Sequence, residues 1–149
     1  MKIGSRGLNL LKDFEQCKLQ TYKCSAGKLT IGWGHTGPDV QPNSVWTQAK
    51  ADAVLLEDLR RAETAINTAV RYRLNQNQFD ALVCFAFNVG IQAFADSTMR
   101  RLLNEGSPDK AALQFARWNK VTVGGVMEVS NGLTRRRLDE QKLFELKPK

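Results

Sequence analysis

Apolar residues recur at helical spacing over two long stretches of the chain. Leu8, Leu11 and Phe14 repeat at steps of three, which predicts a first helix that Ser5 caps. From Thr47 to Val70 the apolar residues recur at steps of four and three, while most charged residues fall off that stripe. This second pattern predicts a long amphipathic helix that begins at Thr47 and joins two lobes.

The pattern changes between these two helices. Two short stretches of strand-forming residues from Tyr22 to Ile31 flank SAGK, residues 25–28, which predicts a β-hairpin with its turn at SAGK. The next segment, GWGHTGPDVQPNS (32–44), is rich in glycine, proline and polar residues and predicts an exposed loop. A second, smaller hairpin is expected at Val121–Val129, around the glycine pair 124–125.

Capping signals divide the rest of the chain into helices. Asn75 and Gln78 form a capping-box pattern before an apolar run that Gly90 ends. Further helices are expected to begin at Ser97, at Ser107–Pro108 and at Thr134. The aromatic residues expected in the core of this region are Phe79, Phe85, Phe87, Phe94 and Trp118.

Together these elements predict an α+β fold with a small N-terminal lobe and a larger, mostly helical C-terminal lobe. The small lobe, about residues 13–60, contains the first hairpin, and the other lobe comprises residues 61–149 together with the N-terminal helix. With 149 residues, 42% of them hydrophobic, the chain suits one compact domain with a buried core.

Composition narrows the classes of protein to consider. The three cysteines, Cys17, Cys24 and Cys84, are an odd number without a CxxC pair, and there is a single histidine. We therefore expect no disulfide framework, no metal site and no cofactor. The start of the chain has no apolar block typical of a cleavable signal peptide, so we expect the protein to be made and kept in a cytoplasm.

The net charge of +7 points to a polyanionic partner, and half of the 22 basic residues lie from Arg100 onward. The only basic cluster is Arg135–Arg137, so the scattered bases argue against a nucleic-acid-binding face. Arg135–Arg137 could form a solvated face with one arginine paired inward. Alternatively, the basic helix Thr134–Lys149 could contact anionic outer-membrane lipid.

Three residues around the first hairpin could carry chemistry. Glu15 lies on or beside the apolar stripe of the first helix, where partial burial favours the protonated form that a general acid needs. Cys24 and Thr30 are spaced symmetrically about Gly27, so a turn there would place them face to face, able to hold a water. Alone, each also fits a purely structural role.

Read together, these residues form the pattern E-x8-C-x5-T, followed by IGWGHTG. This pattern resembles that of the phage-type lysozymes (endolysins), the T-even phage class of glycoside hydrolase family 24, whose motif has aspartate or cysteine in second place. Three distant segments resemble the C-terminal lobe of that family in the same order: NQNQFDALVCFAFNVG, FADSTMRRLLNEG and GLTRRRLDEQKLF.

The resemblance implies a lysozyme-like fold and an endolysin muramidase. Such an enzyme hydrolyses the β-1,4 bond between N-acetylmuramic acid and N-acetylglucosamine of peptidoglycan, in a cleft between the lobes, for host lysis. By position, Glu15 would be the proton donor and Thr30 would position the attacking water. Cys24 occupies the usual aspartate position, where a thiolate could act as base or attack the sugar, so the stereochemical outcome stays open.

The resemblance also implies peptidoglycan as partner. Without a signal segment, the enzyme is expected to wait in the host cytoplasm until a holin releases it to the wall, and a monomer is the default expectation. A lytic transglycosylase on the same substrate is an alternative, as are a basic nucleic-acid- or membrane-binding protein without catalysis and an inactive wall-binding relative. His35 is expected to be structural, since the sequence shows no evident acid partner. Trp33 and Trp46 could stack on sugar rings or simply pack.

Overall fold

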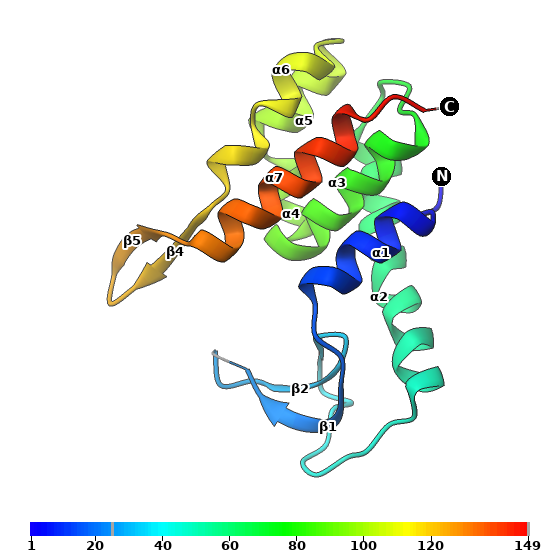
Figure 1. Ribbon diagram of the computed structural model, residues 1–149, viewed down its shortest axis with the longest axis vertical. Coiled ribbons are helices and arrows are strands. Elements are labelled where there is room, and N and C mark those ends of the chain that lie inside the picture. The colour runs from blue at the N-terminus through cyan, green and yellow to red at the C-terminus, as the bar shows by residue number, and fades with distance from the viewer. Residues whose placement is uncertain (25, 149) are drawn as a thin grey trace. The chain divides into compact units, whose positions relative to one another are not determined.

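The computed structural model, which describes residues 1–24 and 26–148, combines helices with two small antiparallel sheets (Figure 1). The predicted α+β class is confirmed. The chain divides into two compact units, a small unit of residues 11–61 and a large unit of residues 1–10 and 62–149. Helices α1 (Ser5–Phe14) and α2 (Gln48–Ala69) each belong partly to both units.

The small unit contains a three-stranded antiparallel sheet in the order β1-β2-β3. Its strands are β1 (Lys18–Lys23), β2 (Leu29–Gly32) and β3 (His35–Thr36). The predicted hairpin is confirmed, although its first strand begins earlier than Tyr22. The prediction of a loop over residues 32–44 was wrong for His35 and Thr36. These two residues form β3 and pair with β2 as Ile31↔His35 and Thr30↔Thr36.

Helix α2 follows its predicted bounds to within one residue at each end. The hydroxyl of Thr47 accepts a hydrogen bond from the N–H of Lys50 at 3.1 Å, so Thr47 is the expected N-cap. The apolar stripe of the helix is buried at Leu55, Leu59 and Ile66. The amphipathic pattern therefore predicted both the element and its buried face.

The large unit is mostly helical. Its remaining helices are α3 (Gln76–Val89), α4 (Ile91–Ala95), α5 (Thr98–Asn104), α6 (Pro108–Ala112), the 3-10 helix η1 (Phe115–Arg117) and α7 (Asn131–Glu145). The second predicted hairpin is confirmed as β4 (Lys120–Val123) and β5 (Val126–Val129). Helices α3 and α7 lie side by side along most of their length (Figure 1).

The capping box before α3 is confirmed. The side chain of Asn75 accepts from the N–H of Gln78 at 2.8 Å, and the side chain of Gln78 accepts from the N–H of Asn75 at 2.9 Å. Gly90 ends the helix as predicted, with its N–H bonded to the carbonyl of Ala86. Ser97 caps α5 by accepting from the N–H of Arg100 at 3.1 Å.

Two predicted helix starts were wrong in detail, and a third is confirmed. The last helix begins at Asn131 rather than Thr134, because the hydroxyl of Ser130 caps it. Ser5 is the first helical residue of α1 and not its cap. The start predicted at Ser107 and Pro108 is confirmed, although that helix has only five residues and Ser107 makes no side-chain capping bond.

An aromatic cluster forms the core of the large unit. The Phe85 ring meets the rings of Phe94, Phe115 and Trp118 edge to face, at centroid distances of 6.4, 5.3 and 5.6 Å. Phe79, Phe85 and Phe94 are fully buried as predicted, whereas Phe87 and Trp118 are half-buried. The prediction omitted two buried phenylalanines of this core, Phe115 and Phe144.

The carboxylate of Asp80 holds the N-terminal residues on the large unit. It is buried and accepts from the N–H of Gly4 at 2.9 Å and from the N–H of Gly7 at 3.1 Å. A Cβ on Gly7 would lie 2.8 Å from the Cβ of Asp80, closer than side-chain atoms approach. The close contact between α1 and α3 therefore requires glycine at this position.

Two of the three consecutive arginines are buried in an ion-paired group, which we call the arginine–glutamate cluster (Arg136, Arg137 and Glu140). Glu140 is fully buried and pairs with Arg136 at 3.1 Å and also with Arg137. Burial raises the pKa of Glu140, and the two guanidinium groups offset part of that rise. The expectation of one inward arginine was wrong, because two point inward and only Arg135 is exposed.

Backbone and aromatic groups complete this cluster. The carbonyl of Cys84 accepts from Arg136 at 3.2 Å, and the carbonyl of Trp118 accepts from Arg137 at 2.9 Å. The Arg137 guanidinium lies 5.0 Å from the centre of the Phe85 ring. The cluster therefore joins α7 to α3 and to the segment before β4.

Candidate active site

The turn of the first hairpin is set by backbone bonds around Cys24. The N–H of Gly27 donates to the carbonyl of Cys24 at 2.8 Å, and the N–H of Cys24 donates to the carbonyl of Lys28 at 2.9 Å. Gly27 has φ +78°, in the left-handed region that favours glycine. The predicted turn, residues 25–28, also includes Ser25, which lies outside the described residues.

The strand register places Thr30 opposite Tyr22 rather than opposite Cys24. The predicted face-to-face pairing of Cys24 and Thr30 was therefore wrong, because the turn closes with Cys24 bonded to Lys28. Side chains alternate along a strand, so Tyr22 and Cys24 still share one face of the hairpin with Thr30. The two predicted residues are diagonal neighbours.

Hydrogen bonding favours the thiolate form of Cys24. The pKa of the half-buried Cys24 is lowered first by the backbone of Lys28, then by the backbone of Ala26 and by the side chain of Thr30. Thr30 itself is buried, and its hydroxyl donates to the carbonyl of Lys28 at 3.0 Å. Hydrogen bonds are thus the main cause of the lowered pKa of Cys24.

Glu15 directly follows α1 and is half-buried. Its carboxylate is next to Gly34, where an added Cβ would lie 3.4 Å from Oε2 of Glu15. Gly34 also has φ +83°, a conformation that residues with side chains rarely adopt. The backbone at Gly34 therefore approaches the carboxyl group without placing a side chain beside it.

Tyr22 connects the two parts of the site. Burial raises the pKa of Tyr22, and the charges of Cys24 and Glu15 raise it further. Both groups therefore lie within electrostatic range of the phenol. Within the small unit, Tyr22 thus lies opposite Thr30 in the strand register and within electrostatic range of Glu15 and Cys24. The sequence did not single out Tyr22, although its place two residues before Cys24 was a usable signal.

His35 has acidic partners that the sequence did not reveal, and we call this group the histidine–aspartate cluster (His35, Asp39 and Asp58). Its Nδ1 lies 2.7 Å from Asp58 and its Nε2 lies 3.0 Å from Asp39. Burial lowers the pKa of His35, but the two aspartates outweigh that effect and raise it. In turn, the hydrogen bond to His35 lowers the pKa of Asp39. This geometry favours the expected structural role.

The two tryptophans of the small unit make specific contacts. Trp33 donates its indole N–H to Asp52 at 2.8 Å, and Lys12 lies 5.4 Å from the centre of its ring. Bonds from Trp33 and then Gln48 lower the pKa of Asp52. Trp46 lies 5.7 Å from the His35 ring, centroid to centroid. These contacts favour packing over exposed sugar-stacking surfaces.

Across residues 1–24 and 26–148, no three or more His, Cys, Asp or Glu side chains are grouped in a way that could hold a metal ion. In the same part of the chain, none of the helices combines the length and the apolar character needed to cross a membrane.

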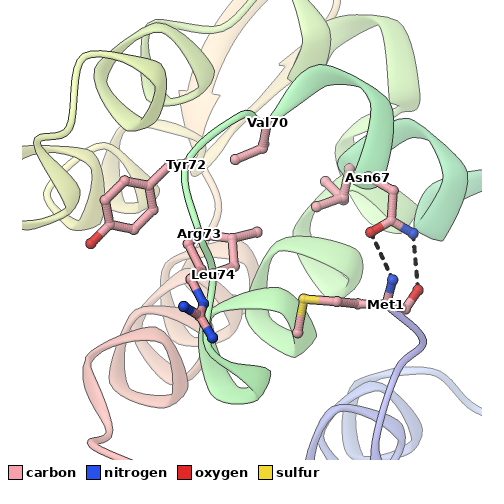
Figure 2. Close-up of a pocket in the computed structure, with 7 residues that line it drawn as sticks. Met1, Asn67, Val70, Tyr72, Arg73 and Leu74 are labelled. Carbon is pink, nitrogen blue, oxygen red and sulfur yellow. Dashed lines mark hydrogen bonds between the residues drawn. The ribbon is translucent and has the colours of Figure 1, made fainter.

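A separate pocket of about 400 Å³ lies on the large unit (Figure 2). Met1 and Asn67 line one side of it and are joined by two hydrogen bonds. The amino group of Met1 donates to Oδ1 of Asn67 at 3.0 Å, and Nδ2 of Asn67 donates to the carbonyl of Met1 at 2.9 Å. Arg73 and Tyr72 are the polar side chains beside its apolar lining. It shares no residue with the candidate active site.

Comparisons with known proteins show which family shares the sequence and fold of this chain. The family model described as Phage lysozyme matches residues 12–140. The endolysin of Bacillus phage PZA is 44% identical over 146 residues, or 97% of this chain, which spans only 55% of that relative. The endolysin of Acyrthosiphon pisum secondary endosymbiont phage 1 is 39% identical, covering 97% of this chain and 99% of its own.

A solved structure agrees. The muramidase domain of SpmX from Asticaccaulis excentricus is 39% identical and superposes with a TM-score of 0.92, covering 98% of this chain and 99% of that one. The lysozyme-like architecture that the resemblance implied is therefore confirmed. With the family model spanning most of its length and close relatives over nearly all of it, this chain belongs to the phage lysozyme family, a family of glycoside hydrolases.

Proposed function

We propose that this chain is an endolysin muramidase that hydrolyses the β-1,4 bond between N-acetylmuramic acid and N-acetylglucosamine in peptidoglycan. The observation that supports it most directly is the grouping of Glu15, Cys24 and Thr30 around Tyr22. Family membership and the relatives named endolysins support the same reaction class.

In this proposal Glu15 donates a proton to the leaving oxygen as the glycosidic bond breaks. The residue is half-buried, and the backbone of Gly34 lies beside its carboxyl group without adding a side chain there. Proton transfer requires the leaving oxygen of the sugar to lie within hydrogen-bond reach of this carboxyl group. Breaking the bond gives an oxocarbenium-like centre, to which the second half of the site must supply a nucleophile.

Cys24 and Thr30 supply that second half. The single hydroxyl proton of Thr30 is donated to Lys28 at 3.0 Å, yet the same hydroxyl stabilises the Cys24 thiolate. The carbonyl oxygen of Lys28 and the sulfur of Cys24 therefore compete for the one hydroxyl proton of Thr30. Ionisation of Cys24 favours donation of this proton to the sulfur. In either orientation the oxygen lone pairs of Thr30 can accept from a water held beside Cys24.

Two routes for Cys24 differ in their product. A thiolate acting as base removes a proton from the attacking water and gives an inverted anomer. A thiolate attacking the sugar carbon forms a covalent intermediate, which water then opens with net retention. Proton NMR of the product anomer immediately after cleavage distinguishes the routes.

The test is loss of turbidity of outer-membrane-stripped Gram-negative cells by wild type, Glu15→Gln, Cys24→Ser and the matched control Glu57→Gln. Removing the general acid should slow lysis by about 10²–10⁴-fold, with folding intact by circular dichroism. Glu57 is an exposed glutamate of the same unit, so its variant should lyse at the wild-type rate. Undiminished clearing by Glu15→Gln would overturn the proposal.

Mass spectrometry of the digested wall decides between hydrolysis and the transglycosylase alternative. Hydrolysis adds the mass of water at each cut, whereas a transglycosylase leaves anhydro-muramoyl ends. Water-adduct ends in the wild-type digest support the muramidase, and anhydro ends would replace it with the transglycosylase.

Release to the wall through a holin stays a prediction. Expressing the chain in a laboratory bacterium with and without a co-expressed holin tests it. Lysis that needs the holin is the expected result, and equal lysis without it would contradict this route.

A further inference from the structure

The β4–β5 hairpin concentrates exposed apolar side chains in ten residues. All residues from 120 to 129 are exposed, and the hairpin extends away from the helices of the large unit (Figure 1). Met127 is 67% exposed and Val129 61%. The large apolar residues exposed on this hairpin are Val121, Val123, Val126, Met127 and Val129. Exposed patches of this kind mark an interaction surface.

Both faces of the hairpin are apolar. Val123 pairs with Val126 and Val121 with Glu128, so three valines lie on one face. Thr122 pairs with Met127 and Lys120 with Val129, which places Met127 and Val129 on the opposite face. A ribbon that packs on a protein usually has one apolar face and one solvated face. Apolar residues on both faces suit surroundings that contact the ribbon on all sides.

Charge is confined to the base of the hairpin. Residues 121–127 carry no charged side chain, and the tip is the glycine pair 124–125, with φ +57° and +81°. Arg117, Lys120 and Arg135 are exposed near the base, against one acid, Glu128, so three bases minus one acid leave +2. An uncharged tip above a basic base matches the layers of an anionic membrane surface.

The base is firmly attached to α7. The N–H of Ser130 donates to the carbonyl of Asn119 at 2.8 Å, and the side chain of Asn119 donates to the hydroxyl of Thr134 at 3.1 Å. Arg135 directly follows Thr134 and therefore lies with the basic residues at the attached end of the hairpin. Since Arg136 and Arg137 are buried, Arg135 alone of the three consecutive arginines is exposed for the lipid contact that was predicted for the last helix.

We propose that the β4–β5 hairpin inserts its tip into an anionic lipid surface while Arg117, Lys120 and Arg135 contact the headgroups. The outer edges of a two-stranded ribbon leave backbone N–H and C=O groups unpaired. Such groups are costly in the hydrocarbon core, so the tip lies at the boundary of headgroups and acyl chains. This surface activity is independent of the proposed hydrolysis.

Co-sedimentation with vesicles tests the proposal. The probes are vesicles of equal parts phosphatidylglycerol and phosphatidylethanolamine, with pure phosphatidylcholine for comparison. The double variant Val123→Asp/Val126→Asp should lose binding to the anionic vesicles by about tenfold or more, because it places charge in the tip. The matched control Leu113→Asp/Leu138→Asp adds the same charge at exposed positions of the large unit and should lose less.

A second measurement reports the depth of the tip. In Val126→Trp, brominated lipid should quench fluorescence more strongly than in Leu113→Trp. Equal loss of binding in both double variants, absence of wild-type binding, or equal quenching at the two positions would overturn the proposal. Concentration-dependent dimers that only Val123→Asp/Val126→Asp abolishes, without vesicle binding, would instead assign the hairpin to a second copy of the chain.

Discussion

The arginine–glutamate cluster of the large unit and the histidine–aspartate cluster of the small unit differ in how deeply their charged side chains are buried. In the first, Glu140 is fully buried and both arginines are nearly so. In the second, the side chain of His35 is 15% exposed, Asp58 29% and Asp39 64%. A buried charge has no water to replace a lost partner, whereas a half-exposed one does. The loss of stability on removing a charged partner should therefore decrease as the exposure of that partner increases.

The largest effect is expected from Glu140→Gln. This change leaves two buried guanidinium groups without their carboxylate, so the free energy of unfolding should fall by about 3–5 kcal/mol. Urea unfolding followed by circular dichroism measures it. The matched control is Glu145→Gln, an exposed position of the same helix, which should shift stability by about 0.5 kcal/mol or less. Equal losses in both variants would contradict the comparison.

Asp58→Asn should come next. Asp58 makes the shorter contact to His35, at 2.7 Å, and it is partly buried. Near pH 5.5 the loss of a hydrogen bond between charged groups should lower the free energy of unfolding by about 1–2 kcal/mol. A loss as large as that of Glu140→Gln would show that partial exposure does not weaken the cluster.

The pH dependence of the histidine–aspartate cluster should be smaller again. The raised pKa of His35 gives stability that is complete below about pH 6.5 and is lost as pH rises through the folded-state value. The lowered pKa of Asp39 gives stability that is complete above about pH 4 and is lost as pH falls through its folded-state value. The cluster should therefore stabilise most between these limits.

Urea unfolding at about pH 5.5 and about pH 8.5 measures this change. The difference in stability between wild type and Asp58→Asn should narrow at the higher pH, because neutral His35 loses its charge attraction. A difference that widens with pH would reverse the assigned sign.

Asp39→Asn should have the smallest effect. Its carboxylate is mostly exposed, so the loss of its contact with His35 should change the free energy of unfolding less than Asp58→Asn does. Added salt should erase most of that difference, while it should leave the effect of Glu140→Gln nearly unchanged. A salt-insensitive loss at Asp39 would be inconsistent with an exposed pair.

Features set by neighbouring residues could be predicted from the sequence. Asn75 and Gln78 form their capping box within four residues, and Thr47 caps α2 through its own first turn. The apolar stripe of α2 likewise gave its buried face, because a helical period is a local property. Family resemblance brought Glu15, Cys24 and Thr30 into one candidate site, and their roles stay predictions.

Features set by distant residues could not be predicted. His35 meets Asp58, 23 residues away, and Arg137 meets the carbonyl of Trp118, 19 residues away. Such partners depend on how elements pack, so RRR indicated a solvated face when two of its members are buried. The register of Thr30 depended on the closure of the turn at Cys24 and Lys28, which spacing about Gly27 alone did not specify.

The bond from the N–H of Gly7 to Asp80 also has a consequence in time. The two residues are 73 positions apart, and residues 1–10 belong with the segment that follows residue 61. At about 5–20 residues per second of synthesis, the ribosome delivers Asp80 about 4–15 s after Gly7. During that interval the whole small unit is made, while the first ten residues still lack the partner that holds them. Residues 4–7 therefore wait for their contact with Asp80 until the small unit has been synthesised.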